Sequence, residues 1–120
     1  MAKVKIVNAM FYGFHGTYEY EREQGQKFYL DVEVTTKDEA AAESDDDRDT
    51  VNSATIYSVV KDAVENKRFK LLRALGVHIG DSILEHCKDV AEVKTVIRKP
   101  SVPISGPIDY VQVEIVRTAK

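Results

Sequence analysis

Three residues with proton-transfer chemistry stand near the ends of strand-like segments in this chain. His15 and Glu21 lie in a loop between Gly13 and Gly25, and Lys99 ends a later strand-like segment. If the two ends meet at one end of a sheet, a carboxylate and a lysine beside an aromatic-lined loop can perform acid–base chemistry on a planar ligand. The same charges also fit a surface ion pair. The residues alone leave both interpretations open.

Composition bounds the class of protein. The 120 residues are 43% hydrophobic and 31% charged, which predicts one soluble globular domain over residues 1–120. A net charge of −3 without a dense Lys/Arg block gives no reason to expect nucleic acid as a partner. No signal-peptide run and no stretch of ~18 apolar residues is present, so we expect no membrane partner and a cytoplasmic location. The single cysteine, Cys87, excludes an intrachain disulfide and a multi-cysteine metal site.

Period-two alternation predicts four strands, each with one buried face. The first ends at Gly13, and Pro100 ends the third because proline donates no ladder hydrogen bond. The connection between the first two strands is too long for a tight turn and leaves room for a pocket wall. The positions that define the strands are Val4, Ile6 and Ala9 to Phe11; Phe28, Leu30, Val32 and Val34; Val93, Thr95 and Ile97; and Val111, Val113 and Ile115.

Two amphipathic helices are predicted between the second and third strands. The first begins at a cap, Asn52 or Ser53, and ends near Asn66, while the second spans about 71–87. Gly76 and Gly80 lie four residues apart in the second helix. Each costs about 1 kcal/mol relative to alanine, so we expect the backbone of another element to approach closely there. The order ββααββ predicts an α+β fold, with an antiparallel four-stranded sheet and two helices on one face.

Residues 37–50 form an acidic segment between the second strand and the first helix. Asp45, Asp46, Asp47 and Asp49 suggest a cation site, but the spacing lacks the glycine and terminal glutamate of a calcium loop. A solvated loop is the favoured interpretation.

Several short segments together resemble one enzyme family. They are residues 12–16 (Tyr-Gly-Phe-His-Gly), 21–26, 41–46, 49–52, 98–100 with Pro103-Ile104, and 113–115. In this order and spacing they resemble the dihydroneopterin aldolase family over nearly the whole chain. The resemblance implies the T-fold, in which ββααββ subunits join their sheets into a barrel-like ring, giving a homo-oligomer of four or, with two stacked rings, eight chains. Ring closure removes the two exposed edges of a four-stranded sheet.

The resemblance also implies an activity: cleavage of 7,8-dihydroneopterin, a pterin, to 6-hydroxymethyl-7,8-dihydropterin and glycolaldehyde in folate synthesis, at sites between neighbouring subunits. No metal, cofactor or Schiff base is implied, because the conjugated C=N of the reduced pterin accepts the electrons of the broken bond. The family's loop glutamate matches Glu21, which would bond to the reacting end of the substrate, and its lysine matches Lys99, which would assist removal of a hydroxyl proton through water. Val51, Asn52 and Leu72 match substrate-binding positions, and for His15 we favour loop packing over proton transfer.

Two residues depart from the family pattern. Ser53 stands where the family usually has a tyrosine that handles the proton returned to the enol intermediate, and an aliphatic hydroxyl is a far weaker acid than a phenol of pKa near ~10. Tyr57, Tyr18 or Tyr20 could supply a phenol instead.

Arg73 stands where the family has a glutamate that accepts hydrogen bonds from the pterin ring. A guanidinium only donates, so it cannot receive those donors. Either Arg73 turns outward and backbone groups hold the ring, or the pocket prefers an acceptor-rich edge or an anionic group such as carboxylate or phosphate. Neither Glu85 nor His78 has the spacing to replace the glutamate.

Three functions remain open from the sequence. The favoured one is a dihydroneopterin aldolase with an altered active site. The second is a relative that acts on another heterocycle, as an epimerase or an aldolase. The third is a non-catalytic ring that binds a metabolite or a partner.

Overall fold

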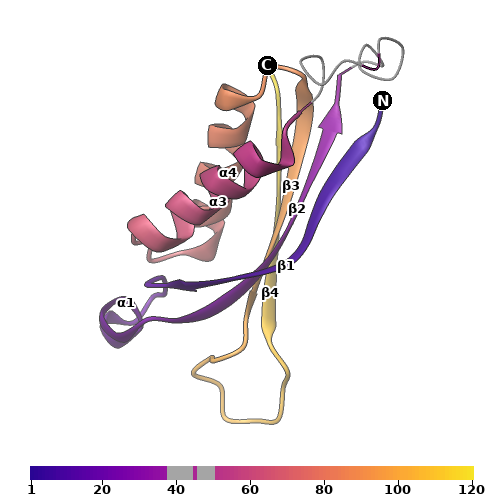
Figure 1. The fold of residues 1–120 in the computed structure, drawn as a ribbon. Helices are drawn as coiled ribbons and strands as arrows, with labels where there is room; N and C mark the ends of the chain where they lie inside the picture. The colour runs from indigo at the N-terminus through magenta and orange to yellow at the C-terminus, as the bar shows by residue number, and fades with distance from the viewer. Residues whose placement is uncertain (38–44, 46–50) are drawn as a thin grey trace.

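The computed structural model describes residues 1–37, 45 and 51–120. The acidic segment 37–50, predicted to be a solvated loop, therefore lies almost wholly outside the described residues. The remaining chain forms one antiparallel sheet with two long helices on one side (Figure 1). The predicted α+β class and its element order are confirmed.

The sheet consists of four strands in the spatial order β1-β2-β3-β4. Their bounds are Lys3–Gly13 for β1, Gln26–Thr36 for β2, Val90–Lys99 for β3 and Val111–Thr118 for β4. Each pair of neighbours is antiparallel, and within the chain β1 and β4 form the two edges. The alternation in the sequence correctly predicts which residues face the helices, because successive strand side chains point to opposite faces.

The two long helices are α3 (Ser53–Asn66) and α4 (Leu72–His86). Asn52 caps α3, since its side-chain oxygen accepts a hydrogen bond of 2.8 Å from the backbone N–H of Ala54. Both helices bury an apolar stripe against the sheet. The core that results contains Phe11, Phe28, Leu30, Val34, Ile56, Val64, Leu75, Ile79, Ile83, Val93 and Ile97, together with several further apolar residues.

A third helix, α1 (Glu19–Gln24), was not predicted and lies within the first connection. It has only six residues, too few for a helical apolar stripe to show in the sequence. In Figure 1 the ends of β1 and β2 that flank α1 curve toward the helix side of the sheet. The long first connection is therefore a folded element at one end of the sheet.

The helical glycines Gly76 and Gly80 lie close to another element, but the expected backbone contact was wrong. A Cβ atom on Gly76 would lie 2.4 Å from Cδ1 of Ile115, and one on Gly80 would lie 2.6 Å from Cγ of Arg117. Both neighbours are side chains of β4. Because Gly76 and Gly80 have no Cβ atoms, α4 packs closely against the side chains of the edge strand β4.

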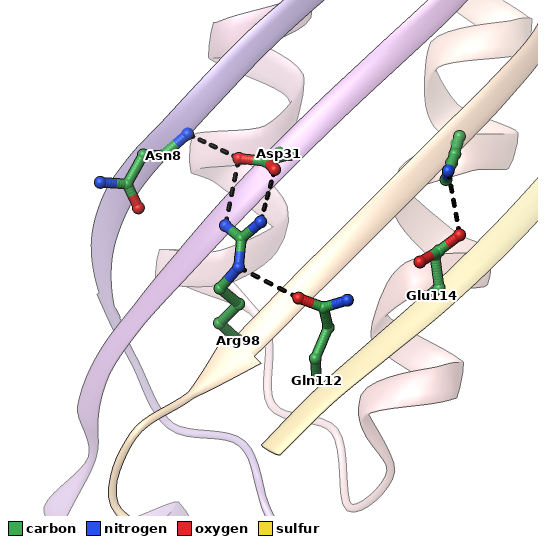
Figure 2. Close-up of polar contacts among 6 residues, drawn as sticks. Asn8, Asp31, Arg98, Gln112 and Glu114 are labelled. Atoms are coloured by element: carbon green, nitrogen blue, oxygen red, sulfur yellow. Dashed lines mark hydrogen bonds and ion pairs between the residues drawn. The ribbon is translucent and has the colours of Figure 1, made fainter. Parts of the chain in front are cut away.

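On the face of the sheet opposite the helices, Arg98 links three strands (Figure 2). It donates to both carboxylate oxygens of Asp31, at 3.1 and 2.6 Å, and its Nε donates to Gln112 at 3.1 Å. Asp31 also accepts a 2.7 Å bond from the backbone N–H of Asn8, which sits at a β-bulge with a φ of 56°. The bonds from Arg98 hold the pKa of Asp31 below its usual value of 3.8. Because Arg98 is held on this face, the next residue, Lys99, points to the helix side.

Candidate active site

A cleft of about 510 Å³ lies where the first connection, the start of α4 and the end of β3 meet. Apolar side chains from α4, from the loop before β4 and from β4 itself form much of its wall. Charged side chains come from three separate parts of the chain. The lining residues are Gly16, Thr17, Tyr18, Glu21, Lys70, Leu71, Leu72, Arg73, Lys99, Val102, Pro103, Ile104, Val111 and Val113.

Glu21 and Lys99 form an ion pair in this cleft. They come from α1 and from the last residue of β3, and they are only 4% and 8% exposed. An exposed ion pair is worth little, whereas charges withdrawn from water must be matched closely. The alternative of an ordinary surface ion pair is therefore wrong, and the predicted meeting of the two loop ends is confirmed.

Backbone and amide groups around α1 hold the Glu21 carboxylate in place. Its Oε1 accepts from the backbone N–H of Tyr18 at 3.2 Å, and its Oε2 accepts from Nε2 of Gln26 at 3.5 Å. Gly16 packs directly against the carboxyl group, because a Cβ there would lie 2.6 Å from Cδ of Glu21. Hydrogen bonds and packing therefore hold the Glu21 carboxylate in place in addition to its ion pair with the Lys99 ammonium group.

Arg22 fixes the loop that packs on Glu21. Its Nη1 donates to the carbonyl oxygens of both Gly16 and Thr17 at 2.8 Å. The N–H of Gly16 donates in turn to the carbonyl of Phe69 at 3.0 Å, in the connection between α3 and α4. These bonds tie the floor of the cleft to the helical layer.

His15 supports the loop from beneath and does not line the cleft. It is fully buried, and its Nδ1 accepts a 3.1 Å bond from the backbone N–H of Phe69. Nε2 must then carry the proton, which it donates to the carbonyl of Val64 at 2.8 Å. Burial lowers the pKa of His15, and the bond to Val64 offsets this in part. A neutral imidazole with both nitrogens occupied fits the expected packing role.

The start of α4 provides the apolar and cationic rim of the cleft. Leu72 is half-buried, and Arg73 is exposed at the rim, so both family-matched positions of this helix reach the cleft. Lys70 joins them there and was missed by the sequence reasoning. Its position immediately before the Leu71-Leu72 pair was the available signal, because a residue next to a helix start shares that helix's surroundings.

Comparison with known proteins gives this site a family. The family model described as dihydroneopterin aldolase matches residues 4–116. The chain belongs to the dihydroneopterin aldolase family. It is 39% identical over 118 residues to the dihydroneopterin aldolase of Staphylococcus epidermidis, with 98% of both chains covered. The Bacillus subtilis dihydroneopterin aldolase is 34% identical over 117 residues, again with 98% of both chains covered.

A solved structure shares the fold closely. The crystal structure of the Escherichia coli dihydroneopterin aldolase in complex with neopterin superposes with a TM-score of 0.83 at 27% identity. The match covers 98% of this chain and 99% of that one. The T-fold inferred from the resemblance is thereby confirmed for the single chain.

Three of the family-matched positions do not line the cleft of a single chain. Val51 is buried and belongs to the hydrophobic core, Asn52 is occupied as the cap of α3, and Ser53 is exposed as the first residue of that helix. Within one chain, Glu21 and Lys99 therefore share the cleft with Leu72 and Arg73 of α4. The residues at the start of α3 do not line that cleft.

The candidate phenols are also separated by the fold. Tyr18 lines the cleft beside Glu21, and its ring stacks on that of Tyr20 with centroids 5.8 Å apart. Tyr57 instead packs against Phe11, with centroids 5.2 Å apart, and does not line the cleft. Among the three, Tyr18 is the phenol that borders the cleft within one chain.

Residues 1–37, 45 and 51–120 contain neither a cluster of metal-ligating side chains nor a membrane-spanning helix. No group of three or more His, Cys, Asp or Glu side chains there is placed to hold a metal ion. None of the helices is long and apolar enough to cross a membrane.

Proposed function

We propose that this chain is a dihydroneopterin aldolase of folate synthesis, a carbon–carbon lyase that works in the cytoplasm, and that the Glu21–Lys99 pair is its catalytic centre. The observation that carries the proposal is the burial of this pair in a cleft large enough for a heterocycle. Family membership supports the reaction, and the structure of the E. coli relative with neopterin supports the ligand class.

The reaction requires little beyond positioning and proton movement. The bond between the first and second side-chain carbons of 7,8-dihydroneopterin breaks, and its electron pair moves into the conjugated C=N of the ring. The hydroxyl proton on the second carbon leaves as glycolaldehyde forms, and the first carbon regains a proton to give the hydroxymethyl product. Glu21 is the group that bonds to the reacting end of the substrate, and Lys99 assists removal of the hydroxyl proton through water.

The second proton transfer needs a weak acid that Ser53 does not provide. Tyr18 supplies this phenol in our proposal, because it borders the cleft beside Glu21. In a Tyr18→Phe variant we expect 6-hydroxymethyl-7,8-dihydropterin to form at least about 100-fold more slowly, the lower end of the range typical of general acid catalysis. Unchanged turnover in Tyr18→Phe would remove Tyr18 from the mechanism, and a loss in Tyr57→Phe instead would assign the phenol to helix α3 of the neighbouring chain.

The rest of the site comes from a second copy of the chain in this proposal. Val51, Asn52 and Ser53 match substrate-binding positions yet lie away from the cleft of their own chain. A ring of four chains, or two stacked rings, brings the start of α3 from one subunit to the cleft of its neighbour. The open edges β1 and β4 are the surfaces that such a ring closes.

The experiment that tests the function is incubation of the protein with 7,8-dihydroneopterin, followed by chromatography of the products. We expect 6-hydroxymethyl-7,8-dihydropterin and glycolaldehyde in equal amounts. Epimerised substrate without glycolaldehyde would favour the second function considered above, an epimerase. No change in the substrate at high protein concentration would reject catalysis on this compound.

A further inference from the structure

Within one chain, the described residues that line the cleft carry an excess of positive charge. The whole chain has a net charge of −3, yet the cleft is lined by three cationic side chains and one carboxylate. Glu21 is already paired with Lys99. Lys70 and Arg73 therefore remain, and neither forms an ion pair with another of the described residues.

The surroundings of Arg73 on α4 offer no counter-charge. The residues one turn further along the helix are Gly76 and Val77, and the first turn of α4 contains no acidic residue. Asp81 shares an outer groove with Arg73, but its carboxylate is held by Arg117 at 2.8 Å. Among the described residues, no carboxylate on the outer side of α4 therefore pairs with the arginine.

The position of these charges is unfavourable for the fold alone. Arg73 lies in the first turn of α4, and Lys70 lies just before it. Cations at the start of a helix oppose its dipole, which favours anions there. In addition, the cap residue Leu71 has no side chain that bonds to the first N–H groups of the helix. An anionic group bound in the cleft between Lys70 and Arg73 would compensate for both features.

We infer that the heterocycle bound by this cleft carries an oxyanion, a phosphate or a carboxylate, which Lys70 and Arg73 bind. The inference rests on the proposed function, because it concerns the ligand of that same site. Arg73 offers a planar fork of donors that matches an oxyanion, and Lys70 adds a second cation. Lys70 and Arg73 line the same cleft as the Glu21–Lys99 pair, so one ligand can reach all four residues.

Calorimetric titration with three stable pterins tests the inference. Neopterin is neutral in its side chain, neopterin monophosphate carries a phosphate, and pterin-6-carboxylate carries a carboxylate. We expect the better of the two anionic pterins to bind about 10–100-fold more tightly than neopterin, the gain of one or two charge-assisted hydrogen bonds. This gain should shrink as salt is added, because exposed charges are screened beyond about 10 Å at 0.1 M. Inorganic phosphate, titrated alone, shows whether the heterocycle is needed for the phosphate to bind.

Two charge-removing variants and a matched control assign the effect to the rim. Arg73→Gln and Lys70→Gln should each lose most of the gain, measured within each variant as the ratio of its affinity for the anionic pterin to its affinity for neopterin. Lys88→Gln makes the same charge change at a lysine that lines a different groove, and it should behave like the unmodified protein. Both rim side chains are exposed, so these substitutions leave the core intact.

The outcomes separate the inference from the proposed function. Equal affinity for all three pterins, or a gain that survives in both rim variants, overturns the inference and leaves the function standing. Tight binding of inorganic phosphate with no added gain from the heterocycle also overturns it. If none of the pterins binds, both the inference and the proposed function are rejected.

Discussion

Glu21 and Lys99 place opposite charges where water is largely excluded, so each depends on the other. Removing one partner of a buried pair leaves an uncompensated charge, at a cost of about 3–5 kcal/mol. We therefore predict that Lys99→Met and Glu21→Gln each lower the free energy of unfolding by an amount near this range. The double variant should cost clearly less than the sum of the two. Urea unfolding at pH 7 and fixed protein concentration measures all four proteins.

Additive single effects, each below about 1 kcal/mol, would contradict this prediction, since that is the behaviour of an exposed pair. The matched control is Lys94→Met with Glu114→Gln. That pair has an N–O distance of 3.0 Å, but its side chains are 40% and 48% exposed. Removing this exposed pair should change the free energy of unfolding by less than about 1 kcal/mol.

His15 predicts a specific pH dependence of stability. Burial holds its folded-state pKa below the usual 6.5. Above pH 6.5 the residue is neutral in both states and contributes no slope, whereas below that value the unfolded chain takes up a proton that the folded protein does not. The free energy of unfolding should therefore fall as the pH drops from about 6.5.

The comparison for this prediction is His15→Gln, measured by urea unfolding between neutral pH and pH 4.5. The variant should be less stable at neutral pH by about 1–3 kcal/mol, because a buried partner is lost. Its profile should also be flatter in this window. The stability that comes from the lowered pKa of Asp31 is lost mainly below its usual pKa of 3.8, which is outside this window. Parallel profiles for the two proteins would show that His15 does not titrate as inferred.

At the residue scale, the sequence predicted the groups but not all of their surroundings. Glu21 and Lys99 could be paired in advance, because both follow strand-like segments whose ends meet in an antiparallel sheet. The excess charge at the rim was harder to predict, because the only signal for Lys70 is its position next to the Leu71-Leu72 pair. It depends on how the connection between α3 and α4 folds back beside β1.

At the scale of elements, the contact between α4 and β4 depends on the missing side chain at Gly76. Alanine there would gain about 1 kcal/mol of helix propensity. Its Cβ would, however, meet Cδ1 of Ile115 at 2.4 Å and Cγ1 at 2.8 Å. Overpacking of this kind costs about 1–3 kcal/mol. We predict that Gly76→Ala lowers the thermal midpoint.

Gly106→Ala is the control for this prediction, because a Cβ there meets nothing within 4 Å. It should change stability by no more than about 0.5 kcal/mol. In an Ile115→Ala background, Gly76→Ala should become neutral or stabilising. If Gly76→Ala stabilises the unmodified protein, α4 does not pack on Ile115 as described.

Strong periodic patterns made most of the elements predictable. Helices α3 and α4 and all four strands have apolar residues at regular spacing, and their predicted bounds differ from the observed ones by a few residues. Helix α1 has no such pattern. Its place is set by local bonds, such as that from Tyr18 N–H to Glu21, and by the clamp of Arg22 on the preceding loop. The sequence does not predict these hydrogen bonds, because they depend on the folded conformation of the loop.

At the scale of the whole molecule, β1 and β4 are the two sheet edges that no other strand of the described residues covers, and in our proposal a second chain completes the site. An unpaired edge is a template for another strand, and the residues at the start of α3 lie away from the cleft that they match. We predict by sedimentation equilibrium a species of four or eight times the 13.5 kDa chain mass. A stable monomer at micromolar concentration would contradict a site shared between copies of the chain.

In our proposal, the buried Glu21–Lys99 pair cleaves the pterin side chain. The rate of glycolaldehyde release from 7,8-dihydroneopterin, measured for the unmodified protein and for Glu21→Gln side by side, tests this claim most directly. We predict a rate about 100–10,000-fold lower in Glu21→Gln, the loss typical of a positioned proton-transfer group. Equal rates in the two proteins, or no glycolaldehyde from either, would contradict the claim.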